Sequence, residues 1–270
     1  MTNLAQRALS AVVALPLLAL LVLWHRRLGF GLFILLAAGL ALHEYAAITL
    51  PTAKRSLRCG IIAVGVGLSA GLYFGPHLAL LWVLAALVLV AFLTLIEPGE
   101  INEASARLGK AGFGVFYLGA LSAPLALMQR DLPYGPQWVF VVVAVSFAND
   151  TVAYFAGRAL GRHKLYPLIS PSKTVEGAVG GLLGGVVMMF IARATFFSAL
   201  SVADCLLVAI PAAVLGPIGD LVESMLKRSG GVKDSGKLIP GHGGVLDRID
   251  ALLFVGAWVY AYAAYVRLTP

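Results

Sequence analysis

Charge is scarce in this sequence. Asp, Glu, Lys and Arg make up 12% of the 270 residues, whereas a soluble domain carries about 25%. Cysteine is scarcer still, because the chain has only Cys59 and Cys205, far apart and outside any CxxC spacing. Nothing in this pattern suggests a disulfide framework or a thiolate metal site, so both cysteines are predicted to pack as small apolar residues. The shortage of charge also argues against a soluble globular domain.

Long apolar runs take the place of charge. Hydrophobic residues form 60% of the chain, its mean hydropathy is +0.91, and runs of about 20 apolar residues suffice to cross a bilayer. Continuous runs favour helices over a membrane barrel. We therefore predict an all-α, polytopic integral membrane protein with about nine transmembrane helices. The predicted spans are 8–24, which we interpret as a membrane helix and not a cleaved signal peptide, 29–49, 60–75, 78–96, 111–129, 137–156, 175–198, 202–223 and 249–267.

The basic residues set the orientation of these spans. Five of the 20 Lys and Arg residues fall on one side, and the other 15 fall on the side of the N-terminus, which is therefore predicted to be cytoplasmic. The net charge of +7 is then explained by topology and by anionic lipid heads, and does not imply nucleic acid. We predict scaffold helices over 1–135 and a catalytic region over 136–270. In that region, we expect the polar loops 157–174 and 224–248 to emerge on the same face and to cover one site at the cytoplasmic membrane surface.

Acidic residues near helix ends mark a candidate site, because ionisable groups inside spans are costly and usually functional. Asp150 lies inside the sixth span, and Asp220 lies near the end of the eighth. Asp220 shares a helix face with Ser224 and Lys227 at i, i+4, i+7 spacing. Glu44, near the end of the second span, is explained equally well as a structural partner for a polar side chain on a neighbouring helix.

Two further carboxylates, Asp247 and Asp250, open the ninth span one helical turn apart. Oxygen ligands of this kind suit a hard cation such as Mg²⁺, which also takes substrate phosphates. Nearby Lys and Arg side chains would hold the remaining phosphate oxygens, as phosphoryl or nucleotidyl transfer requires. A zinc site fits less well, because His242 lacks a His or Cys partner at ligand spacing.

The loops around these acids carry their own signals. Lys173 precedes the seventh span, where the helix dipole favours acids, so we expect it to hold an anion. An ordinary basic flank on the cytoplasmic side explains Lys173 equally well. Ser172 or Thr174 is the expected helix cap. Glycines between 230 and 244 are predicted to allow close approach and to offer N–H groups to phosphate. Glycines at small-xxx-small spacing within 177–185 are predicted to allow close packing of the seventh span against another helix.

Residues 224–250, "SMLKRSGGVKDSGKLIPGHGGVLDRID", resemble the signature of the phosphatidate cytidylyltransferase (CDP-diacylglycerol synthase) family. Every fixed position of that long, gapped pattern is present: Ser224, Lys227, Arg228, Lys233, Asp234, Gly236, Pro240, His242, Gly243, Gly244, Asp247, Arg248 and Asp250. The stretch "NDTVAYFAGRALGRHKLYPLISPSKTVEGAVGG", residues 149–181, is also similar to this family. The resemblance therefore extends over roughly residues 145–260.

The resemblance implies an enzyme of phospholipid biosynthesis that joins CTP to phosphatidic acid and releases pyrophosphate. It implies Mg²⁺, with K⁺ as a candidate second cation, bound near Asp220 and Asp247, in a homodimer within the cell membrane whose active site faces the cytoplasm. Combined with the residue chemistry, it gives the catalytic set Asp220, Lys227, Asp247 and Arg248. The predicted substrate-binding set is Lys173, Ser224, Arg228, Lys233, Asp234, His242 and Asp150.

Two other classes remain open. Acids and glycines inside spans are also typical of a transporter or channel, although here they gather at one face instead of the midplane. Another lipid-phosphate enzyme, such as a CDP-alcohol phosphotransferase or a polyprenol kinase, would use related chemistry. The sequence upstream of Asp247 and Asp250 lacks the DG…AR part of the CDP-alcohol phosphotransferase pattern, which argues against that family.

Overall fold

The chain folds into two compact units. A computed structural model describes residues 16–23, 27–238 and 243–267. The first unit is Met1–Leu127 with Ser229–Arg248, and the second is Met128–Arg228 with Ile249–Pro270. The glycine-rich residues 229–248 thus belong with the N-terminal helices, although they lie in the C-terminal half of the sequence.

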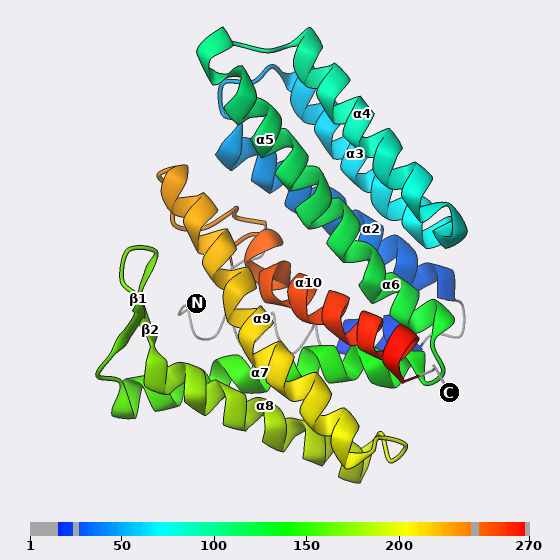
Figure 1. The fold of residues 1–270 in the computed structure, drawn as a ribbon, viewed down its shortest axis with the longest axis vertical. Helices are drawn as coiled ribbons and strands as arrows, with labels where there is room; N and C mark the ends of the chain where they lie inside the picture. Colours follow the sequence, from blue (N-terminus) through cyan, green and yellow to red (C-terminus); the bar gives the residue numbers. More distant parts are fainter. Residues whose placement is uncertain (1–15, 24–26, 239–242, 268–270) are drawn as a thin grey trace. The chain divides into compact units, whose positions relative to one another are not determined.

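The first unit is a stack of helices drawn from blue to green in Figure 1. Helix α3 packs against α2, α4 and a π-helical segment that follows α5. The elements are α2 (Arg27–Thr49), α3 (Arg55–Phe74), a 3₁₀ turn (Pro76–Leu78), α4 (Ala79–Ile96), a 3₁₀ turn (Ile101–Glu103), α5 (Ala104–Gly114), the π-helical segment (Val115–Ala120) and α6 (Leu121–Asp131). Helix α6 continues past the boundary of the unit at Leu127.

The core of the first unit follows one face of α3. Leu57, Ile61 and Leu68 are buried there at helical spacing and belong to the same apolar cluster as Val90 of α4. The opposite face of α4 carries large exposed apolar side chains; Leu95, for example, is 77% exposed. Apolar residues on the outside and small or apolar residues within are what a lipid environment requires.

The second unit pairs two helices closely and adds a small hairpin. Its elements are α7 (Gly135–Leu160), β1 (Lys164–Tyr166), β2 (Ser170–Thr174), α8 (Val175–Thr195), α9 (Val202–Ser229), α10 (Leu246–Ala261) and a π-helical end (Tyr262–Val266). Helices α7 and α8 lie side by side, with the hairpin rising from their ends (Figure 1). The strands pair antiparallel, Lys164 with Thr174 and Tyr166 with Ser170. The predicted polar loop 157–174 therefore contains a two-stranded hairpin.

The glycines of α8 have the role predicted for them. A Cβ at Gly177 would lie 2.9 Å from the Ala153 carbonyl oxygen, and one at Gly184 would lie 2.6 Å from the Val152 side chain. Both contacts are with α7, so close helix packing is confirmed. Gly185 differs, because a Cβ there would meet its neighbours only at ordinary van der Waals distance.

The predicted class is confirmed, because eight helices among the described residues are long and apolar enough to cross a membrane. The predicted first span, 8–24, lies largely outside the described residues, and its last part, 16–23, is helical. Helix α9 extends to Ser229 instead of 223, since long basic side chains tolerate a helix end at the interface. Cys205 is buried as predicted, but the prediction for Cys59 is wrong. Cys59 is exposed on α3, between the inward-facing Leu57 and Ile61.

Candidate active site

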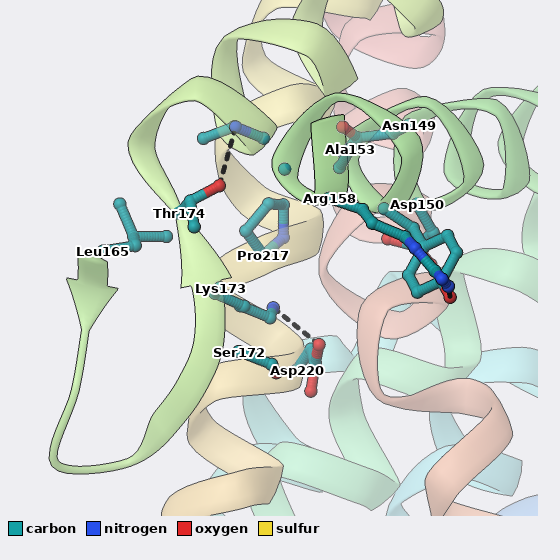
Figure 2. Close-up of a pocket in the computed structure, with 14 residues that line it drawn as sticks. Asn149, Asp150, Ala153, Arg158, Leu165, Ser172, Lys173, Thr174, Pro217 and Asp220 are labelled. Carbon is teal, nitrogen blue, oxygen red and sulfur yellow. Dashed lines mark hydrogen bonds and ion pairs between the residues drawn. The ribbon is translucent and has the colours of Figure 1, made fainter. Parts of the chain in front are cut away.

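A pocket of about 450 Å³, lined by apolar and charged side chains, lies in the second unit. Its walls come from α7, the hairpin, the start of α8 and the middle of α9. Asp150 and Arg158 of α7 line it together with Lys173 and Asp220, and Figure 2 shows the side chains of Lys173 and Asp220 pointing toward each other. The Lys173 Nζ atom lies 2.5 Å from Asp220 Oδ2. The pocket thus brings together three residues that the sequence predicted for one site.

The local structure around Lys173 explains how its side chain reaches α9. Strand β2 ends at Thr174, whose hydroxyl accepts a hydrogen bond from the Gly177 N–H at 3.0 Å and caps α8. Thr174 is thus confirmed as the cap. The anion that Lys173 meets is the Asp220 carboxylate, and both side chains stay accessible, at 23% and 38% exposure. A substrate phosphate can therefore compete for the same ammonium group.

Asp220 of this pair also belongs to a group of three carboxylates. Asp220, Glu223 and Asp250 each offer an oxygen within 4.8 Å of the others. Glu223 and Asp250 are buried, and Lys227 Nζ lies 2.5 Å from Glu223 Oε2. Lys173 and Lys227 bring two ammonium groups to these three acids, and carboxylate oxygens at this spacing could hold a cation.

Helix spacing on α9 explains part of this cluster. The Ser224 hydroxyl donates a hydrogen bond of 3.2 Å to Asp220 Oδ1, which confirms that these residues share a face. Lys227 pairs with Glu223 at i, i+4, a contact that the sequence analysis missed although the spacing signals it. Arg228 is exposed near the end of α9.

The remaining predicted site residues belong to the first unit. Asp247 Oδ2 accepts hydrogen bonds from the N–H of Ser235 at 2.9 Å, the hydroxyl of Ser235 at 2.9 Å and the N–H of Gly244 at 2.8 Å. Lys233, Asp234 and Arg248 are exposed. His242 lies outside the described residues.

One glycine N–H of this loop donates to the protein itself, whereas for the other glycines a role in presenting N–H groups to phosphate stays a prediction. The Gly244 N–H donates to Asp247, a carboxylate of the protein. A Cβ at Gly236 would lie 2.5 Å from Glu44 Oε1. These glycines therefore admit protein side chains, and Glu44 is the acid that they admit.

The fold and the pocket define a helical membrane protein whose polar site pairs acids with lysines. The chain matches the model of the cytidylyltransferase family over residues 5–266, and it belongs to this family. A phosphatidate cytidylyltransferase of Brucella abortus (strain 9-941) is 34% identical over 98% of this chain and 94% of its own. One of Bacillus subtilis is 36% identical over 65% of this chain and 64% of its own, and one of Staphylococcus haemolyticus is 45% identical over 45% and 46%.

Proposed function

We propose that this protein transfers the cytidylyl group of CTP to phosphatidic acid, giving CDP-diacylglycerol and pyrophosphate. The observation that carries the proposal is the family match over nearly the whole chain. The Brucella relative aligns with 98% of this chain, and its name, phosphatidate cytidylyltransferase, gives phosphatidic acid as the substrate. The pocket supports it independently, because a lysine beside a carboxylate cluster suits a reaction between two phosphate groups.

In the proposed reaction a phosphate oxygen of the lipid attacks the α-phosphorus of CTP in line. The new bond joins that oxygen to the α-phosphorus, the bond to the β-phosphate oxygen breaks, and its electron pair leaves with pyrophosphate. A phosphate monoester has a second pKa of about 6, so the attacking group is already an anion at neutral pH. No strong general base is required, and the protein mainly positions the two phosphates and offsets their charge.

The basic residues would hold these phosphates. Lys173 lies in the pocket with an accessible ammonium group, and we assign it to a substrate phosphate. Lys227, Arg228, Lys233 and Arg248 are proposed for the same work on the evidence of the signature. Asp150, Ser224, Asp234 and His242 are proposed to contact or support the substrates.

Magnesium is proposed as the cofactor. Carboxylate oxygens are its preferred protein ligands, and Asp220 with its neighbours Glu223 and Asp250 supplies such oxygens within 4.8 Å. Asp220 would hold the ion in the second unit, and Asp247 remains the proposed ligand from the first. When bound, Mg²⁺ would neutralise charge on the triphosphate. A second cation such as K⁺ is part of the same proposal.

Membrane placement follows partly from the fold. The apolar helices make this an integral membrane protein. The excess of Lys and Arg on one side supports a site that opens to the cytoplasm, where CTP is dissolved. A homodimer within the cell membrane is proposed from the resemblance alone.

The test uses purified protein in detergent with phosphatidic acid, Mg²⁺ and CTP labelled at its α-phosphate. Label should pass into the organic phase, and Asp220→Asn, Asp247→Asn or a chelator should abolish it. Lys237→Gln, at an exposed loop position outside the proposed site, is the control and should retain transfer. Folded protein that labels no lipid would refute the assigned reaction. Flux of substrate into vesicles without chemistry would favour a transporter.

A further inference from the structure

Glu44 is a buried acid near the end of α2. Its carboxylate accepts hydrogen bonds from the Ser235 hydroxyl at 2.9 Å, the Val245 N–H at 3.0 Å and the Leu246 N–H at 2.9 Å. All three donors come from one short stretch, about 200 residues further along the chain. A carboxylate inside an apolar helix is costly unless donors surround it, so Glu44 and this stretch stabilise each other's positions.

Ser235 links Glu44 to Asp247. Its hydroxyl oxygen lies 2.9 Å from Glu44 Oε2 and also 2.9 Å from Asp247 Oδ2. A hydroxyl has one hydrogen and donates to one acceptor at a time. The backbone N–H groups of Ser235 and Gly244 therefore hold Asp247 continuously, while Val245 and Leu246 hold Glu44. The two carboxylates thus share a single network of donors.

The glycines of the loop provide independent evidence that the loop is shaped to contact Glu44. A Cβ at Gly236 would lie 2.5 Å from Glu44 Oε1. A Cβ at Gly244 would collide with both Glu44 Oε2 and the Ser235 hydroxyl. Gly243 has a φ of +79°, a conformation that other residues rarely adopt. Glycine at these positions is thus required by the approach of Glu44 and by the turn that precedes Asp247.

We propose that Glu44 is a positioning residue: it fixes Ser235 and residues 244–246, and thereby the orientation of the Asp247 carboxylate. This inference rests on the proposed function, in which Asp247 takes part in cytidylyl transfer. Groups that orient a ligand carboxylate typically change metal affinity or activity by about 10–100-fold when removed. A role confined to folding would lower stability and leave the properties of the folded enzyme unchanged.

The test compares Glu44→Gln with wild type. The amide can keep one acceptor oxygen, but its NH₂ group must face an N–H or O–H donor, so the stretch has to shift. We expect kcat to fall by about 10–100-fold, and the Mg²⁺ concentration for half-maximal activity to rise.

Glu97→Gln is the matched control. Glu97 is also a glutamate of the first unit that accepts a backbone hydrogen bond, from Lys54 N–H at 2.6 Å, and it pairs with Arg107. Its contacts join other segments, so kcat should stay near wild type. Ser235→Ala is the milder second variant, because it removes one donor and leaves both glycines in place. Ser235→Ala should therefore show a smaller decrease in kcat and a smaller rise in the Mg²⁺ requirement than Glu44→Gln.

A second readout does not depend on activity. In a Cys59→Ser background, Leu238→Cys places a thiol on an exposed position of the loop, and Cys205 is buried. Thiol labelling should become several-fold faster with Glu44→Gln and stay unchanged with Glu97→Gln.

The outcomes separate this inference from the proposed function. Wild-type kcat and wild-type labelling in folded Glu44→Gln would overturn the positioning role. So would a loss of activity that merely follows the amount of folded protein, with kcat, the Mg²⁺ requirement and labelling unchanged in the folded fraction. If wild-type protein performs no cytidylyl transfer, the proposed function fails, and the labelling rates still decide whether Glu44 orders the loop.

Discussion

Replacement of Lys227 by methionine tests the electrostatics of the acidic cluster. Lys227 Nζ lies 2.5 Å from Glu223 Oε2, and the Glu223 side chain is only 1% exposed. Methionine keeps an apolar stem of similar length but removes the cation from a group that also contains Asp220 and Asp250. Removing one partner of a buried pair costs about 3–5 kcal/mol.

The size of the effect should be visible in thermal unfolding. A loss of 3–5 kcal/mol corresponds to a decrease in Tm of about 6–20 °C, at about 2–4 °C per kcal/mol for a chain of this size. Lys227→Arg retains the charge and should lose much less. The double variant Glu223→Gln with Lys227→Met should recover most of the loss, because neither charge is then buried alone.

Magnesium adds a second measurement in the same assay. An ion present at about 100 times its Kd stabilises the folded state by about 2.7 kcal/mol. The more negative cluster of Lys227→Met should bind the ion more tightly than wild type, so Mg²⁺ should raise its Tm by the larger amount. A Tm for Lys227→Met within about 2 °C of wild type, and no recovery in the double variant, would refute the reasoning.

Two other substitutions probe opposite purposes. Lys173→Gln removes the ammonium group beside Asp220 and should lower kcat/KM by about 100-fold. Lys164→Gln, on the exposed strand β1, should change kcat/KM little. Equal kcat/KM values for the two variants would contradict a phosphate-binding role of Lys173. Tyr262→Phe removes a buried donor to Asp204, at 2.5 Å, and should lower stability by about 1–3 kcal/mol without changing kcat. Calorimetry and steady-state rates check this, and a wild-type Tm would contradict it.

The sequence by itself determined the class, the family and the local geometry. Apolar runs define membrane helices because the bilayer demands about 20 apolar residues in succession, and eight such helices are described. Positions four residues apart on α9 meet because a helix repeats every 3.6 residues, so the contact of Ser224 with Asp220 was predictable. Thr174 as a cap was equally local. The signature at 224–250 gave the family, which the match over residues 5–266 confirms.

Only the tertiary structure decided which distant residues meet. Lys173 pairs with Asp220, and Glu44 receives donors from Ser235 and Leu246. Periodicity and hydropathy report how each helix faces its surroundings, but not which other segment lies there. That choice depends on the packing of whole helices, and on the requirement that every buried carboxylate find donors wherever the chain brings them. The same requirement explains Gly236, because the Glu44 carboxylate occupies the space that a side chain at this position would need.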